Sequence, residues 1–117
     1  MGNRYITPDS IGPEAVKGLF VTRHLKGEKA FSGAENLPSV SAIAPGVLGL
    51  TGIETGEIVG GINEHIRPAL IIAIDALAAQ KICRLGTTIQ LSDTGISPGS
   101  GVGNNRKELS QKSMGVP

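Results

Sequence analysis

Aromatic side chains are scarce in this sequence, cysteine occurs once, and neither sign of charge is in excess. Tryptophan is absent and aromatic residues make up 3% of the 117 residues, so any core has to be built from aliphatic side chains. The single cysteine, Cys83, excludes an internal disulfide and fits a reducing compartment. A chain of this length forms one domain at most, over residues 1–117.

Features that direct a protein to nucleic acid or to a membrane are also missing. The net charge is +1 and Arg106-Lys107 is the one adjacent basic pair, so no basic stripe predicts direct binding to nucleic acid. The apolar run at residues 69–79 is interrupted by Asp75 and is too short to span a bilayer. No secretory signal peptide is recognisable. We therefore expect a soluble, cytoplasmic protein.

Two segments have the pattern of a helix. Pro13 suits the first turn of a helix, where its missing N–H costs nothing, and predicts a short helix over residues 13–19. Residues 53–66 are the clearest helix, because three isoleucines recur every four residues and share one face: Ile58, Ile62 and Ile66. At the start of that helix, Thr51 and Glu54 fit a capping box.

Other apolar segments have the pattern of strands. Residues 70–74 are continuously apolar, as in a strand that is covered on both faces, whereas residues 87–91 alternate between polar and apolar. We predict further strands at residues 20–22 and 40–44, and a helix at residues 76–84. Strands that alternate with helices imply parallel pairing, so the predicted fold class is α/β, a layered sandwich around a mostly parallel central sheet.

The chain contains only three aspartates, and each lies at a junction between predicted elements. Asp9 is in the turn before the first helix, Asp75 follows the buried strand, and Asp93 follows the last strand. Ligands bind at the carboxyl ends of strands in open α/β sheets, so the three carboxylates could converge there. A carboxylate pair can share a proton and perform general acid–base catalysis on water. The alternative is that each aspartate caps a following helix.

The remaining candidate side chains have simpler interpretations. His24 could be a base or a ligand, but no second histidine lies at ligand spacing, and a surface position explains it as well. His65 lies near the carboxyl end of a predicted helix, where a cation is favoured in any case. Cys83 fits a small core residue. We therefore predict no metal ion and no cofactor.

Residues 90–110 form a glycine-rich loop that follows the last predicted strand. Residues 99–103 lack the Gly-Lys-Ser/Thr ending of a P-loop, but their backbone N–H groups could bind a peptide carbonyl or an oxyanion; a plain loop is the alternative. Asp93-Thr94-Gly95 is the tripeptide of pepsin-like and retroviral aspartic proteases. Those proteins are all-β, so the alternation of helices and strands argues against that fold here.

Several blocks of the sequence, covering nearly the whole of residues 2–117, match one family. Taken together they resemble the germination proteases, the atypical aspartic endopeptidases of endospore-forming bacteria. The blocks are Thr7-Pro8-Asp9-Ser10-Ile11-Gly12-Pro13, Val21-Thr22-Arg23-His24-Leu25, Val40-Ser41-Ala42-Ile43-Ala44-Pro45-Gly46-Val47, Thr51-Gly52-Ile53-Glu54-Thr55, Ile72-Ala73-Ile74-Asp75-Ala76-Leu77-Ala78-Ala79 and residues 90–110.

The resemblance implies an activity, a fold and a pair of catalytic residues. Family members degrade small acid-soluble spore proteins in the spore core during germination, are made as zymogens and assemble as tetramers. Their fold resembles that of the hydrogenase-maturation proteases, an α/β sandwich. The two proposed catalytic aspartates of the family correspond here to Asp9 and Asp75, which leaves Asp93 a structural or substrate-side role.

The chain departs from the family in length. Family members are longer on both sides, the pro-segment has no counterpart, and the sequence diverges between Leu25 and Val40. We therefore expect a truncated chain, a single partial peptidase domain over residues 1–117. Two functions follow: an endopeptidase that uses Asp9 and Asp75, or a non-catalytic α/β module that folds or self-associates without cleaving.

Overall fold

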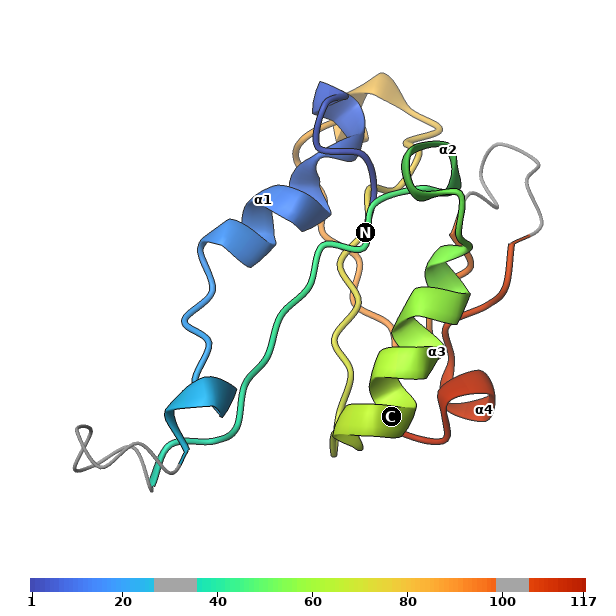
Figure 1. Cartoon of the computed structure of the whole chain (residues 1–117). Helices are drawn as coiled ribbons and strands as arrows, with labels where there is room; N and C mark the ends of the chain where they lie inside the picture. Colours follow the sequence, from blue (N-terminus) through green and yellow to red (C-terminus); the bar gives the residue numbers. More distant parts are fainter. Residues whose placement is uncertain (27–35, 99–105) are drawn as a thin grey trace.

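The computed structural model describes residues 1–26, 36–98 and 106–117, and the regular elements of these residues are helices (Figure 1). Short 3-10 helices are labelled η. In chain order the elements are η1 (Thr7–Asp9), α1 (Ile11–Lys17), η2 (Arg23–Leu25), α2 (Leu48–Thr51), α3 (Thr55–Ile66), η4 (Ile82–Arg84) and α4 (Gln111–Met114). None of the helices in the described ranges is long and apolar enough to cross a membrane.

The predicted α/β sandwich with a parallel central sheet is wrong. The described residues contain no strand, and the one β-bridge among them is an isolated antiparallel contact between Ile96 and Leu109. A sheet requires neighbouring extended segments that exchange hydrogen bonds along their length. The backbone contacts between the described non-helical segments are confined to single positions, such as Ile96 with Leu109, and do not continue into a ladder.

The first helix is confirmed, with shifted bounds. α1 begins at Ile11 and ends at Lys17, two residues earlier at each end than predicted. Pro13 lies in its first turn, as expected, where the backbone donors have no partner within the helix. The helix ends at Gly18, whose N–H donates to the carbonyl of Ala15 over 3.1 Å.

The predicted strands at residues 20–22 and 40–44 are wrong. These segments do meet, and Figure 1 shows the two stretches running alongside each other, but a side chain makes part of the connection. The buried hydroxyl of Thr22 donates to the carbonyl of Pro38 over 2.5 Å and accepts from the N–H of Val40 over 2.9 Å. Because this hydroxyl takes the place of backbone groups, no regular ladder forms.

The longest helix is also confirmed, but its predicted capping box is wrong. α3 begins at Thr55, two residues later than expected, and ends at Ile66, as predicted. Thr51 belongs to α2, which was not predicted, and its hydroxyl hydrogen-bonds the carbonyl and the N–H of Ile53. That hydroxyl is therefore committed to the turn between the two helices, and Glu54 precedes α3 without a side-chain cap.

The predicted central strand at residues 70–74 is wrong, because these residues form no regular secondary structure. The N–H of Ile71 donates to the carbonyl of Pro117 over 2.8 Å, and no second backbone hydrogen bond joins these two segments. The side chains of Leu70 and Ile72 are 57% and 78% exposed. A continuous apolar run is typical of a strand that is covered on both faces, but in this run the side chains of Leu70 and Ile72 face solvent.

The predicted helix at residues 76–84 and the predicted strand at residues 87–91 are both wrong. Only the 3-10 turn η4 forms within the first segment. The second segment has no strand partner among the described residues, and Ile89 and Leu91 are 93% and 96% exposed. The alternation of polar and apolar residues at 87–91 therefore occurs in a segment whose apolar side chains do not pack against any described part of the chain.

Buried apolar side chains are concentrated at the carboxyl-terminal end of the chain. Leu109 exchanges two backbone hydrogen bonds of 2.8 Å with Ile96, and Met114 lies in α4. Both side chains are buried. The amide of Asn63 in α3 donates to the carbonyl of Met114 over 2.7 Å, which fastens α4 to α3.

Candidate active site

Asp9 is held at the end of a tight turn. It is the last residue of η1, and Pro8 favours that turn because its ring fixes the backbone dihedral angle φ. The N–H of Asp9 donates to the carbonyl of Ile6 over 2.9 Å. Its carboxylate Oδ2 accepts from the N–H of Asn3 over 2.7 Å, and the side chain is half-buried. Both the backbone and the carboxylate of Asp9 are thus fixed by local hydrogen bonds.

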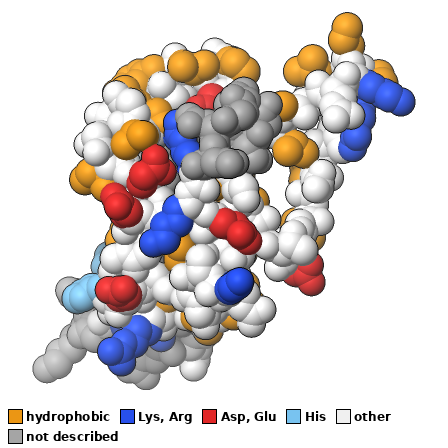
Figure 2. Space-filling model, turned by 90° about the vertical axis from the view of Figure 1, so that its right-hand side faces the viewer, with side chains coloured by type: hydrophobic (Ala, Val, Ile, Leu, Met, Phe, Trp, Pro, Cys, Tyr) orange, Lys and Arg blue, Asp and Glu red, His pale blue; other side chains and the backbone are white. Residues whose placement is uncertain are grey.

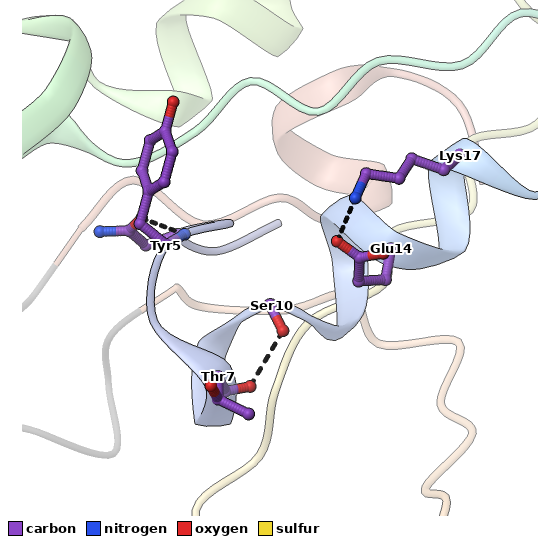
Figure 3. A network of polar contacts seen from close by, with 6 residues as sticks. Tyr5, Thr7, Ser10, Glu14 and Lys17 are labelled. Carbon is purple, nitrogen blue, oxygen red and sulfur yellow. Dashed lines mark hydrogen bonds and ion pairs between the residues drawn. The ribbon is translucent and has the colours of Figure 1, made fainter.

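The polar groups around this turn hold it to α1 (Figure 3). The hydroxyl of Ser10 donates to the carbonyl of Thr7 over 3.0 Å, and the N–H of Tyr5 donates to the side-chain oxygen of Asn3 over 2.9 Å. Lys17 and Glu14 form an ion pair one turn apart on α1. That pair is exposed and contributes little to stability. The hydrogen bonds of Ser10 and Asn3 are the ones that shape the turn of Asp9.

Asp75 directly follows the extended segment 70–74 and is half-buried. We expected a mostly buried side chain, and the structure leaves it more open. The preceding carbonyl, that of Ile74, accepts a hydrogen bond from the amino group of Met1. A β-carbon built on Gly12 would lie 2.6 Å from the same carbonyl, so the missing side chain of Gly12 allows α1 to approach this segment.

The segment of Met1 and Gly2 links the surroundings of the two aspartates. Gly2 contacts Asp9, whereas Met1 contacts the carbonyl next to Asp75. Figure 1 shows the amino terminus close to the segment that follows α3. The Asp9 charge is close enough to act on Asp75 and raise its pKa.

The pKa of the Asp75 carboxyl is raised above its ordinary value. Burial is the largest cause, because it penalises the charged form, and the like charge of Asp9 adds to it. Three influences act in the opposite direction: the ammonium group of Met1, a hydrogen bond from the N–H of Ala76, and the charge of Arg106. The raised pKa makes Asp75 easier to protonate than an ordinary aspartate.

Asp93 is not part of this arrangement. Its side chain is exposed, and it is not among the charges that act on Asp75. Its neighbours Ser92 and Thr94 hydrogen-bond each other through their hydroxyls over 2.6 Å. Of the other two aspartates, Asp9 is among the charges that act on Asp75, whereas Asp93 is not.

Arg106 is the site residue that the sequence reasoning missed. Its charge acts on Asp75, and its Nε atom is buried without a hydrogen-bond partner among the described residues. From the sequence, Arg106-Lys107 is considered only as a basic pair that could bind nucleic acid. Lys107 serves packing instead, since its Cβ lies 3.0 Å from the position of a β-carbon on Gly56 in α3. This packing holds the residue next to Arg106 against the start of α3.

The other predicted candidates do not contribute to the site. His24, His65 and Cys83 are all exposed, so the prediction of Cys83 as a core residue is wrong. In the described part of the chain no three His, Cys, Asp or Glu side chains are grouped in a way that could hold a metal ion. The glycine loop at residues 99–103 lies outside the described residues.

The whole chain, residues 1–117, matches the model of one protein family, described as germination protease. The chain belongs to the germination protease family. Germination proteases of Clostridium acetobutylicum, Caldanaerobacter subterraneus and Bacillus subtilis are 60%, 53% and 56% identical to it over 117 residues. Each alignment covers 100% of this chain and 36%, 36% and 32% of the respective relative. The chain thus spans about a third of the length of the germination proteases it matches.

Family membership confirms the resemblance drawn from the motif blocks. The germination protease family is a peptidase family, so a hydrolytic site is expected in its members. The catalytic roles that the resemblance implies for Asp9 and Asp75 stay a prediction. The charge of Asp9 does act on Asp75 and contributes to its raised pKa.

Proposed function

We propose that this chain is the part of a germination endopeptidase that carries the catalytic carboxyl pair, Asp9 and Asp75. The proposed substrates are the small acid-soluble spore proteins, and the proposed location is the cytoplasm of the spore core. The observation that supports the proposal is that Gly2 contacts Asp9 while Met1 contacts the carbonyl next to Asp75, and that the charge of Asp9 acts on Asp75 although the two residues are far apart in sequence.

The asymmetry of the pair suggests a role for each carboxyl group. Asp75, whose pKa is raised by burial, is assigned the role of general acid, and Asp9, whose Oδ2 accepts a hydrogen bond from the N–H of Asn3, is assigned the role of general base. Asp9 takes a proton from water as the water oxygen attacks the carbonyl carbon of the peptide. Asp75 gives its proton to the carbonyl oxygen. Asp9 then passes the proton it took from water to the amide nitrogen and the C–N bond breaks, while a hydroxyl of the gem-diol returns a proton to Asp75, which leaves a carboxylic acid and an amine as products and restores the pair.

Arg106 has a supporting part in this mechanism. A fixed cation near the pair stabilises negative charge as it develops on the carbonyl oxygen of the substrate. The charge of Arg106 also lowers the pKa of Asp75, against the effect of burial. The proposed function therefore uses three ionisable side chains from three separate segments.

We also propose that the chain acts within a homo-oligomer, a tetramer as the family resemblance implies. The alternative, a non-catalytic module that self-associates, draws on the same feature, the many exposed large apolar side chains. Catalysis is favoured over this alternative because association alone gives no reason for two acidic groups to approach each other at a half-buried position.

The experiment is cleavage of a purified small acid-soluble spore protein by the 117-residue chain and its Asp9→Asn and Asp75→Asn variants. Each replacement keeps the shape of the side chain and removes the carboxylate, so each should lower kcat by a factor on the order of 10²–10⁴. Asp93→Asn is the matched control and should retain activity. Circular dichroism establishes that all variants are folded. Full activity of a folded Asp75→Asn variant would refute the proposed pair.

A further inference from the structure

Asp9 lies against a short backbone segment formed by Gly2 and Asn3. The Asn3 N–H donates to Oδ2 of Asp9 over 2.7 Å. Gly2 is buried and faces the other carboxylate oxygen, because a β-carbon built on Gly2 would lie 2.9 Å from Oδ1 and 3.1 Å from the carboxyl carbon. The same β-carbon would overlap the backbone oxygen of Asp9. Both oxygens of the carboxylate are thus bounded by this segment.

Two independent constraints reserve position 2 for glycine. The first is the lack of space, because the backbone and the carboxylate of Asp9 occupy the place of a side chain. The second is the backbone itself, whose φ of 103° lies in the left-handed region that residues with a side chain rarely adopt. The need for a flexible residue would explain the positive φ of Gly2. It would not explain why the Asp9 carboxylate occupies the place of a side chain at position 2.

We propose that Gly2 and Asn3 are positioning residues, which hold the Asp9 carboxylate in one orientation toward the reacting water: Asn3 binds one oxygen, and Gly2 leaves room for the other. This inference rests on the proposed function. Gly2 supplies the space that the carboxylate occupies, and Asn3 supplies the hydrogen bond that stops it rotating. Orientation matters because a displacement of about 1 Å in a reacting group can lower the rate by about 10²-fold.

The first test is Gly2→Ala, measured by steady-state cleavage of a small acid-soluble spore protein. The added methyl group displaces the carboxylate without removing it, so kcat should fall by about 10²-fold while KM stays within about twofold. Gly18→Ala is the matched control. Gly18 is exposed, has an ordinary φ of −86°, and offers a β-carbon the nearest neighbour at 3.7 Å. That control should keep the wild-type kcat. A folded Gly2→Ala variant with wild-type kcat overturns the proposal.

A second variant covers the case in which Gly2→Ala does not fold. Asp9→Glu leaves Gly2 unchanged and keeps a carboxylate, but the longer side chain cannot keep the hydrogen bond to Asn3 in the same orientation. It should be folded and lose kcat to a similar degree. Wild-type kcat in Asp9→Glu would mean that orientation is not controlled by this segment, and would overturn the proposal.

A spectroscopic readout separates this inference from the proposed function. In the amide NMR spectrum of the 117-residue chain, the Asn3 resonance should move in Asp9→Ala and in Asp9→Glu, because both disturb its hydrogen bond, and should stay in place in Gly18→Ala. This measurement needs no cleavage. A wild-type chain that does not cleave refutes the proposed function, whereas an Asn3 resonance unmoved by both Asp9 variants refutes the positioning role.

Discussion

Asp75 combines partial burial with proximity to a second carboxylate, and both raise its pKa. A carboxyl group with a raised pKa in the folded chain binds protons more readily there than in the unfolded chain. Between the unfolded value, about 3.9, and the higher folded value, the folded state therefore holds more protons. Stability consequently falls as pH rises through this window, and above it the ionised Asp75 costs the fold free energy.

The first prediction is that Asp75→Asn stabilises the fold at neutral pH. The neutral amide has no ionisation cost, so the free energy of unfolding should be higher for the variant at pH 7. Below the unfolded pKa both side chains are neutral, and the advantage should disappear. Urea unfolding of both proteins at pH 3 and pH 7 measures the difference. An advantage that is equal at the two pH values would show that titration of Asp75 is not its origin.

At the residue scale, the sequence alone located the site only in part. Asp9 and Asp75 were marked by their junction positions, but so was Asp93, and the choice between them came from the family resemblance. Arg106 carries no motif of its own, because its role depends on where the chain places it in space. The role of Gly2 cannot be predicted from the sequence either, because the sequence does not show which glycine faces a carboxylate and which faces solvent.

At the element scale, helices form where the sequence has an apolar repeat of helical period and residues that suit a helix terminus. α3 was predicted because its isoleucines repeat every four residues, and α1 because Pro13 suits a first helical turn. The strands were wrong for a common reason. A helix satisfies its own backbone hydrogen bonds, whereas a strand depends on a neighbour, and the sequence of residues 70–74 or 87–91 contains no information about whether that neighbour is present.

The second prediction concerns two glycines in α3. A β-carbon on Gly61 would meet nothing within 4 Å, and the residue lies in the helix interior. Gly61→Ala should therefore raise the free energy of unfolding by up to about 1 kcal/mol through helix propensity. Gly56→Ala is the counterpart, because its β-carbon would lie 3.0 Å from Cβ of Lys107. It should lower the free energy of unfolding by about 1 kcal/mol through overpacking.

Chemical denaturation of the wild type and the two variants measures both effects. The opposite signs are the important result, because helix propensity alone would stabilise both variants. A stabilised Gly56→Ala variant would show that α3 does not pack against Lys107 as described. That outcome would also mean that α3 does not pack against the segment that carries Arg106.

At the scale of the whole molecule, the chain is open for its length. Its radius of gyration is 15.8 Å, whereas a compact domain of about 100 residues has a value of about 13 Å. Only Leu109 and Met114 are buried large apolar side chains among the described residues, and many others are exposed. Figure 2 shows hydrophobic side chains on the surface, gathered most densely toward the top of that view. A surface of this kind favours association.

The third prediction is that the isolated chain self-associates. Light scattering at concentrations on the order of micromolar should give a mass above that of one chain. Ile89→Lys combined with Leu91→Lys should reduce the mass, because these two side chains are 93% and 96% exposed. Gln90→Lys adds a charge to the same segment without removing an apolar group and is the control. A strict monomer in the wild type would contradict the proposed oligomer.

The central claim is that Asp9 and Asp75 act as one unit, and a double-mutant cycle tests it most directly. The measurement is kcat/KM for cleavage of a small acid-soluble spore protein by the wild type, Asp9→Asn, Asp75→Asn and the double variant, all shown to be folded. Two carboxyl groups that share one proton fail together, so the double variant should lose no more activity than either single variant, within about threefold. Losses that multiply, or a folded single variant with wild-type kcat/KM, would contradict the claim.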